Sequence, residues 1–182
     1  MCVKIDESDK RAEFFKAKLR LCGMIETPRW IFVSGAAQKL FCYEGETLVK
    51  EYPCSTSAKP PSCQYGSNGT PLGLHKISEK IGAGAAKGAI FEKRVDTGKI
   101  AFGDDGTGKT YTTSRILWLD GLEEGKNCGH ECGSYNRKIY IHGINLEDKI
   151  GKPWSNGCVE LKNDDVIELF DWAKEGDMVL ID

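Results

Sequence analysis

Three short runs rich in β-branched and aromatic residues follow one another closely, and this pattern constrains the fold more than any other feature. The runs occupy residues 30–33, 39–43 and 47–52. They are separated by Ser34-Gly35 and by Glu44-Gly45-Glu46, which are turn-forming segments. Runs of this length, joined by so few residues, are typical of adjacent antiparallel strands. The sequence therefore predicts a β-meander in this region.

The rest of the chain adds further strands and a helix near each end. Strands are predicted at residues 72–77, 115–119, 138–142 and 178–181. In the first segment, helical spacing places four residues on one face, and Gly23 follows them as a C-terminal cap: Phe14, Phe15, Leu19 and Cys22. The second helix is predicted to be capped by Asn163 and ended by Gly176.

These elements indicate one mostly β domain with one or two packed helices. We assign residues 1–28 to an N-terminal helical segment and residues 29–182 to the domain that carries the function. Residues 55–70 are rich in Ser, Pro, Gly and Asn, and residues 81–89 are rich in Gly and Ala, so both are predicted to be loops. The chain of 182 residues shows no internal repeat and no second domain.

Composition excludes several classes of function. Twenty-five basic and 27 acidic residues give a net charge of −2, so nothing in the charge favours nucleic acid or an anionic membrane as a partner. No apolar run reaches the roughly 18 residues of a membrane span, and the first residues lack the apolar core of a signal peptide. The eight cysteines could form disulfides, and Cys54–Cys63 and Cys128–Cys132 are candidate pairs.

One segment matches the phosphate-binding P-loop pattern, and we reject that interpretation. Gly103 to Thr110 fits G-x-x-x-x-G-K-[ST]. The motif binds phosphate only where a helix begins at its Lys-Thr, because the helix N-terminus supplies the amides. The next residues disfavour a helix, and only nine residues separate Thr110 from Asp120. We predict a Gly/Asp loop between strands and no nucleotide hydrolysis.

A second cluster, Cys128, His130 and Cys132, offers three zinc ligands at crowded spacing without a second Cys/His pair. We therefore expect a solvated loop or a local disulfide there and no metal site.

The residues that could carry chemistry are His142 and Cys158. A thiol nucleophile needs a base within hydrogen-bond reach, and main-chain amides that stabilise the oxyanion. His142 is predicted at the end of a strand, and Cys158 follows a Ser-Asn-Gly turn in which Gly157 lets a substrate approach the main chain. A buried cysteine and a core histidine are the structural alternatives for such a pair.

The surrounding sequence resembles the L,D-transpeptidase catalytic domain (YkuD-like) family over residues 30 to 182. The resemblance is carried by the matching segments Gln38-Lys39-Leu40, Thr70-Pro71-Leu72-Gly73 and Ile141-His142-Gly143, the twelve-residue step to Ser155, and Ser155-Asn156-Gly157-Cys158. The resemblance implies a β-sandwich-like domain that forms peptidoglycan cross-links through a cysteine thioester, without a cofactor. It also implies peptidoglycan stem peptides as partners, and a location in the cell envelope or periplasm. We expect a monomer.

Carried over by position, the resemblance makes Cys158 the nucleophile and His142 the base, with the Gly143 carbonyl orienting the imidazole. It assigns the oxyanion donors to the amides of Gly157 and Cys158, in a pocket that also includes Ser155 and Asn156.

The sequence departs from the family pattern within the predicted site. Asn156 replaces a histidine and cannot titrate, and Glu160 replaces an arginine and reverses a charge. Trp154 and Ile144 also replace residues usual in the family, and we predict that they contact substrate together with Tyr140 and Glu160. A carboxylate near Cys158 should raise the pKa of the thiol. The predicted activity is L,D-transpeptidation with altered substrate preference. The alternatives are hydrolysis of wall peptides as a carboxypeptidase, and a wall-binding protein without catalysis.

Overall fold

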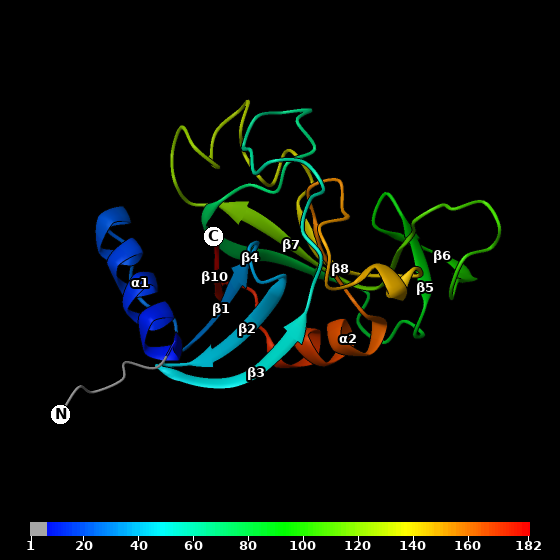
Figure 1. Cartoon of the computed structure of the whole chain (residues 1–182), viewed down its shortest axis with the longest axis horizontal. Coiled ribbons are helices and arrows are strands. Elements are labelled where there is room, and N and C mark those ends of the chain that lie inside the picture. Colours follow the sequence, from blue (N-terminus) through cyan, green and yellow to red (C-terminus); the bar gives the residue numbers. More distant parts are fainter. Residues whose placement is uncertain (1–6) are drawn as a thin grey trace.

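A computed structural model describes residues 7–182 of the chain, with side chains from residue 10 onward. The fold is mostly β, as predicted (Figure 1). Its elements are α1 (Glu7–Cys22), β1 (Arg29–Ser34), β2 (Lys39–Glu44), β3 (Thr47–Pro53), β4 (Gly73–Ile81), β5 (Ala89–Glu92), β6 (Val95–Ile100), β7 (Thr112–Gly121), β8 (Tyr140–Ile144), the 3-10 turn η1 (Glu147–Lys149), β9 (Val159–Leu161), α2 (Asn163–Trp172) and β10 (Met178–Ile181).

The predicted meander forms one end of a mixed sheet. Strands β1, β2 and β3 pair in antiparallel order, and β10 from the end of the chain lies parallel to β1. The sheet continues from β10 through β4, β7 and β5 to β6, while β8 pairs with β7 and β9. The C-terminal strand thus joins the meander to the strands that hold the predicted site.

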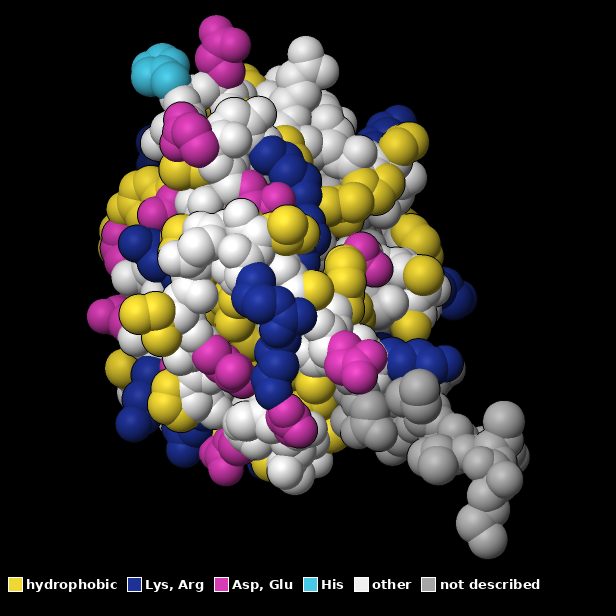
Figure 2. All heavy atoms as spheres, turned by 90° about the vertical axis from the view of Figure 1, so that its left-hand side faces the viewer, with side chains coloured by type: hydrophobic (Ala, Val, Ile, Leu, Met, Phe, Trp, Pro, Cys, Tyr) yellow, Lys and Arg dark blue, Asp and Glu magenta, His cyan; other side chains and the backbone are white. Residues whose placement is uncertain are grey.

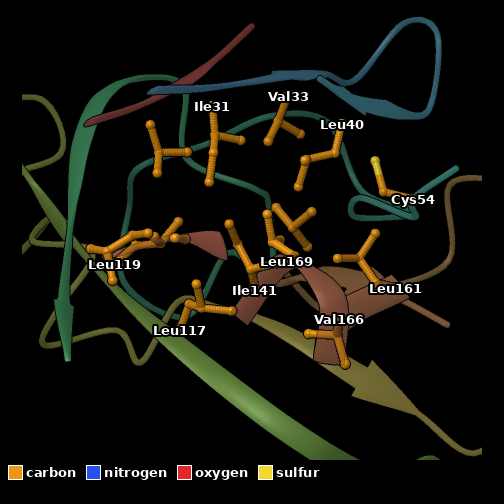
Figure 3. Close-up of a cluster of buried hydrophobic side chains, with 14 of the residues drawn as sticks. Ile31, Val33, Leu40, Cys54, Leu117, Leu119, Ile141, Leu161, Val166 and Leu169 are labelled. Atoms are coloured by element: carbon orange, nitrogen blue, oxygen red, sulfur yellow. The ribbon is translucent and has the colours of Figure 1, made fainter. Parts of the chain in front are cut away.

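The main core lies between two parts of this sheet. Side chains from β1 and β2 meet side chains from β7, β8 and α2, as Figure 3 shows. Fully buried members of this cluster include Ile31, Leu40, Leu117, Ile141 and Leu169. The opposed layers agree with the sandwich-like fold implied by the resemblance.

Helix α1 covers the opposite side of β1 and β2. Phe15 stacks on Trp30 with ring centroids 4.0 Å apart, and Trp30 stacks in turn on Tyr43 at 4.1 Å. The prediction for Phe14 is wrong, because its side chain is 37% exposed, whereas Phe15 and Leu19 are buried. Successive helical residues differ by about 100° around the axis, so Phe14 and Phe15 cannot both face the sheet.

The surface carries both signs of charge. On the face in Figure 2, Lys and Arg side chains are interspersed with Asp and Glu, in keeping with the small net charge. Neither described helix has the length and apolar character needed to cross a bilayer.

The predicted capping role of Asn163 is wrong. The N-cap of α2 is Lys162, which makes no side-chain capping bond, and Asn163 is the first helical residue. The Asn163 side chain is fully buried and accepts bonds from the hydroxyls of Thr113 and Ser114, while its amide group donates to the Ile144 carbonyl. A Glu147 carboxylate accepts the main-chain N–H of Asn163 at 2.8 Å and so replaces the capping side chain.

Candidate active site

The predicted base lies on β8, and the predicted nucleophile directly precedes β9, the parallel strand beside it. In the β8–β9 pair, Ile141 is aligned with Val159 and His142 with Glu160. Side chains alternate between the two faces of a strand, and Ile141 and Val159 belong to the main core. His142 and Glu160 therefore share the opposite face. Cys158, just before β9, packs on that face with the cluster that includes Tyr140.

His142 is held in a form suited to accept a proton. It lies in the interior of β8 rather than at its end, and its Nδ1 lies 2.8 Å from the Gly143 carbonyl. Because a carbonyl only accepts, Nδ1 carries the hydrogen and Nε2 keeps a free electron pair. Burial lowers the pKa of His142 to about 4, so the ring is neutral at pH 7.

Cys158 is half-buried, and its sulfur contacts main-chain groups. The N–H of Tyr140 donates to Sγ at 3.4 Å, and the thiol donates to the Lys138 carbonyl at 3.6 Å. Burial, and to a smaller extent the charge of Glu160, raises the pKa of Cys158 to about 12. The thiol is thus protonated at neutral pH, and attack by sulfur requires a base to remove the proton.

The turn before Cys158 depends on Ser155 and Gly157. Ser155 Oγ donates to the Cys158 carbonyl at 2.6 Å and accepts the Gly157 N–H at 3.1 Å. Gly157 has φ +119°, and a Cβ there would lie 3.3 Å from the Gly69 carbonyl oxygen. The absence of a side chain thus lets the 62–69 loop, rather than a substrate, approach the turn. One predicted oxyanion donor, the Gly157 amide, is engaged by Ser155 in this structure.

A small cavity borders this turn. Its volume is about 220 Å³, and its lining includes Asn156, Tyr65, Asn68, Arg137 and Lys138. Arg137 holds the loop in place by donating to the main-chain oxygens of Ser62 at 2.8 Å and Gly69 at 2.7 Å. Sequence reasoning missed Arg137, because no motif marks a residue that reaches the site only through a distant loop.

The four predicted substrate contacts differ in accessibility. Trp154 is 41% exposed, and the Lys149 ammonium lies 5.1 Å from the centre of its ring. Ile144 is fully buried, so a substrate cannot reach it directly, which corrects the expectation for that position. Tyr140 is buried, and its hydroxyl accepts a bond from Arg94 at 3.3 Å.

Glu160 differs most from its predicted role. Only 5% of it is exposed, so it does not present a charge on an open pocket wall. Burial raises the pKa of this carboxyl from 4.5 to about 7, so it is partly protonated at neutral pH. Glu160 therefore presents no exposed charge that could repel a substrate carboxylate, which corrects the expectation for this residue.

Gly143 is needed where β8 passes beneath α2. A Cβ at this position would lie 2.8 Å from the Thr113 carbonyl oxygen and 3.0 Å from Val166 Cγ1. We therefore expect Gly143→Ala to lower the free energy of unfolding by about 2 kcal/mol, because main chain and core must shift apart. Urea unfolding measures the change. Gly35→Ala, where a Cβ would lie 3.4 Å from its nearest neighbour, is the matched control, and equal losses in both variants would contradict the prediction.

The other motifs take no part in this site. Gly103 to Thr110 is a loop, and strand β7 follows where a P-loop would need a helix. Its Asp104 carboxylate accepts the amides of Gly106 and Gly108, which occupies groups that phosphate would need. No group of three or more His, Cys, Asp and Glu side chains within residues described here could hold a metal ion, and the seven described cysteines are free thiols.

His75, in β4, is a core histidine and takes no part in the site. It is fully buried, and its two ring nitrogens lie 2.9 Å from the Gly73 carbonyl and from Ser134 Oγ.

Comparison with known proteins places this geometry in a family. The sequence pattern of the family YkuD, L,D-transpeptidase catalytic domain, matches residues 28–181. A candidate L,D-transpeptidase of Bacillus subtilis (strain 168), YqjB, is 43% identical over 54 residues, which are 29% of this chain and 31% of YqjB.

Solved L,D-transpeptidases share the fold at low identity. L,D-transpeptidase 3 from Mycobacterium tuberculosis, in complex with a faropenem-derived adduct, matches with TM-score 0.52 and 14% identity over 85% of this chain and 60% of that protein. An L,D-transpeptidase from Stackebrandtia nassauensis matches with TM-score 0.50 and 18% identity over 96% and 64%. The chain thus spans less than two thirds of each of these proteins. The family pattern covers residues 28–181 of the 182-residue chain. The chain therefore belongs to the L,D-transpeptidase catalytic domain family.

Proposed function

We propose that this protein is a cysteine acyltransferase that forms peptidoglycan cross-links by L,D-transpeptidation at the cell envelope. The observation that carries the proposal is the placement of His142 on β8 and of Cys158 directly before the adjacent strand β9, on one face of the sheet and within a domain of this family. The free electron pair on Nε2 of His142 and the protonated thiol of Cys158 are the states that base-assisted attack requires. The cavity beside Asn156 and Arg137 is the proposed place for the substrate peptide.

The reaction proceeds in two acyl transfers. Cys158 Sγ attacks the carbonyl carbon of the third stem residue, and its proton passes to His142 Nε2. The C–N bond breaks, D-alanine leaves with that proton, and a thioester remains on sulfur. An amine of a second stem then attacks the thioester carbon. A C–N bond forms, the C–S bond breaks, and the proton lost by the amine returns to sulfur by way of His142. For the first step, Cys158 turns from the Lys138 carbonyl towards His142, and the Gly157 amide exchanges its bond with Ser155 for one with the oxyanion.

Incubation with a purified disaccharide tetrapeptide tests the proposal, with products identified by mass spectrometry. A cross-linked dimer together with released D-alanine is the expected result. Release of D-alanine without a dimer would replace the proposal with the carboxypeptidase alternative. Binding without any product would replace it with the wall-binding alternative.

A further inference from the structure

Glu160 stands beside the proposed base in a way that the proposed reaction does not yet use. It is the direct partner of His142 in the β8–β9 pair, and both side chains lie on the same face. Glu160 is 5% exposed, and its Oε2 is buried without a hydrogen-bond partner among the described residues. A buried carboxyl oxygen without a partner is unfavourable and is uncommon in folded proteins.

The groups around Glu160 leave His142 as its natural charge partner. Cys158 lies two residues before it, just ahead of β9, and Ser55 pairs with it on the other side. The Ser55 hydroxyl donates to the Lys149 carbonyl, while the Lys149 ammonium pairs with Asp148 at 3.2 Å. The charge of Arg137 lowers the pKa of Cys158, but its guanidinium donates hydrogen bonds to the main chain of the 62–69 loop. Among the described residues, no ion pair joins Glu160 to Lys or Arg.

We propose that Glu160, in its ionised form, is a positioning residue that stabilises the imidazolium of His142 while Cys158 is deprotonated. The proposal rests on the proposed function of this pair. The thiol proton moves from Sγ to Nε2, and the carboxylate takes no proton. The hydrogen on Nδ1 stays on the ring and keeps its bond to the Gly143 carbonyl. The positive charge that forms in a buried place is then balanced by the neighbouring negative charge.

Distance decides whether the carboxylate helps or hinders. Neighbouring strands lie about 4.8 Å apart, whereas two residues along one strand span about 6.6 Å. Glu160 is the direct cross-strand partner of His142, whereas Cys158 lies in the turn before β9. We therefore expect the attraction of Glu160 for the imidazolium to exceed its repulsion of the thiolate. Because the pKa of Glu160 is about 7, the effect should appear as the pH rises through neutrality. The base itself, with a pKa of about 4, does not titrate in that range.

The rate of Cys158 alkylation by iodoacetamide tests the inference without any wall substrate. Peptide mapping by mass spectrometry follows Cys158 in the full chain and in Glu160→Gln between about pH 5.5 and pH 8.5. We expect the ratio of wild-type to variant rate to be close to one at the lower pH and to rise to about ten at the higher, with its midpoint near pH 7. The ratio cancels the general increase of thiolate with pH.

Matched variants separate this role from a structural one. Glu92→Gln removes an exposed carboxylate and should keep the wild-type profile, whereas Glu160→Asp should restore part of the rise. In His142→Ala, Glu160→Gln should no longer slow alkylation, because only the repulsion between Glu160 and the Cys158 thiolate remains. A ratio that stays constant or falls with pH would overturn the inference.

An NMR titration of the wild-type His142 ring supplies a second measurement. We expect an inflection near pH 7 that reports Glu160, and its absence would also overturn the inference. If these results hold but tetrapeptide yields no product, only the proposed function fails. If a dimer forms while the profile of Glu160→Gln matches wild type, only this inference fails.

Discussion

Replacing Cys158 with alanine will abolish formation of a covalent faropenem adduct and of the cross-linked dimer. The thiol is the proposed nucleophile, and no acyl-enzyme can form without it. Loss of a covalent nucleophile commonly lowers kcat by about 10³-fold or more. Intact-protein mass spectrometry measures the adduct, and chromatography of the tetrapeptide products measures turnover. Faropenem is a suitable probe because a structurally similar L,D-transpeptidase is described with an adduct derived from it.

Cys63→Ala is the matched control for this prediction. Cys63 is also a partly buried free thiol, and it lies on the 62–69 loop that Arg137 holds near the site. Its Sγ donates to the Leu72 carbonyl at 3.9 Å, whereas that of Cys158 donates to the Lys138 carbonyl. We expect it to keep both adduct and dimer. An adduct that survives in Cys158→Ala and disappears in Cys63→Ala would move the nucleophile to the other cysteine.

Glu160→Gln will raise the free energy of unfolding at alkaline pH and leave it nearly unchanged in mild acid. The pKa of Glu160 is raised in the folded state, from 4.5 to about 7, so the folded protein binds this proton more tightly. The stability that the protonated carboxyl contributes is therefore fully present below about pH 4.5 and is lost as the pH rises through 7. At about 1.4 kcal/mol per pKa unit, the loss reaches about 3 kcal/mol above pH 8. Glutamine stays neutral and avoids it.

Urea unfolding at several pH values measures this effect as the difference between variant and wild type. Taking the difference cancels the contribution of other buried groups, such as His75, whose pKa is lowered to about 4 by burial. A Glu92→Gln control, at an exposed position, should show no such pH dependence. A constant difference across pH would mean that Glu160 is solvated. Together with the alkylation experiment, the expected result would show that ionised Glu160 lowers the free energy of unfolding and raises the reactivity of Cys158.

Local signals in the sequence were sufficient for most of the sheet. The runs before and after Ser34-Gly35 and Gly45 became β1, β2 and β3, and the last apolar run became β10. The hairpin of β5 and β6 was not predicted, because β6 is exposed throughout and lacks an apolar alternation. Strand β9 is only three residues long, and it exists because it pairs with β8, which no local pattern can indicate.

The sequence by itself determined the mostly β fold and, through its resemblance to the family, led to the two residues of the proposed chemistry. Turn residues between apolar runs act over a few positions, and the spacing from His142 to Cys158 can be read directly. Only the tertiary structure decided that Asn163 binds the interior rather than capping its helix, that Ile144 is buried, and that Glu160 lies beside His142 with almost no access to water. Burial and hydrogen bonding at these positions come from strands and loops distant in sequence, and the charge of a carboxyl depends on that surrounding rather than on its neighbours along the chain.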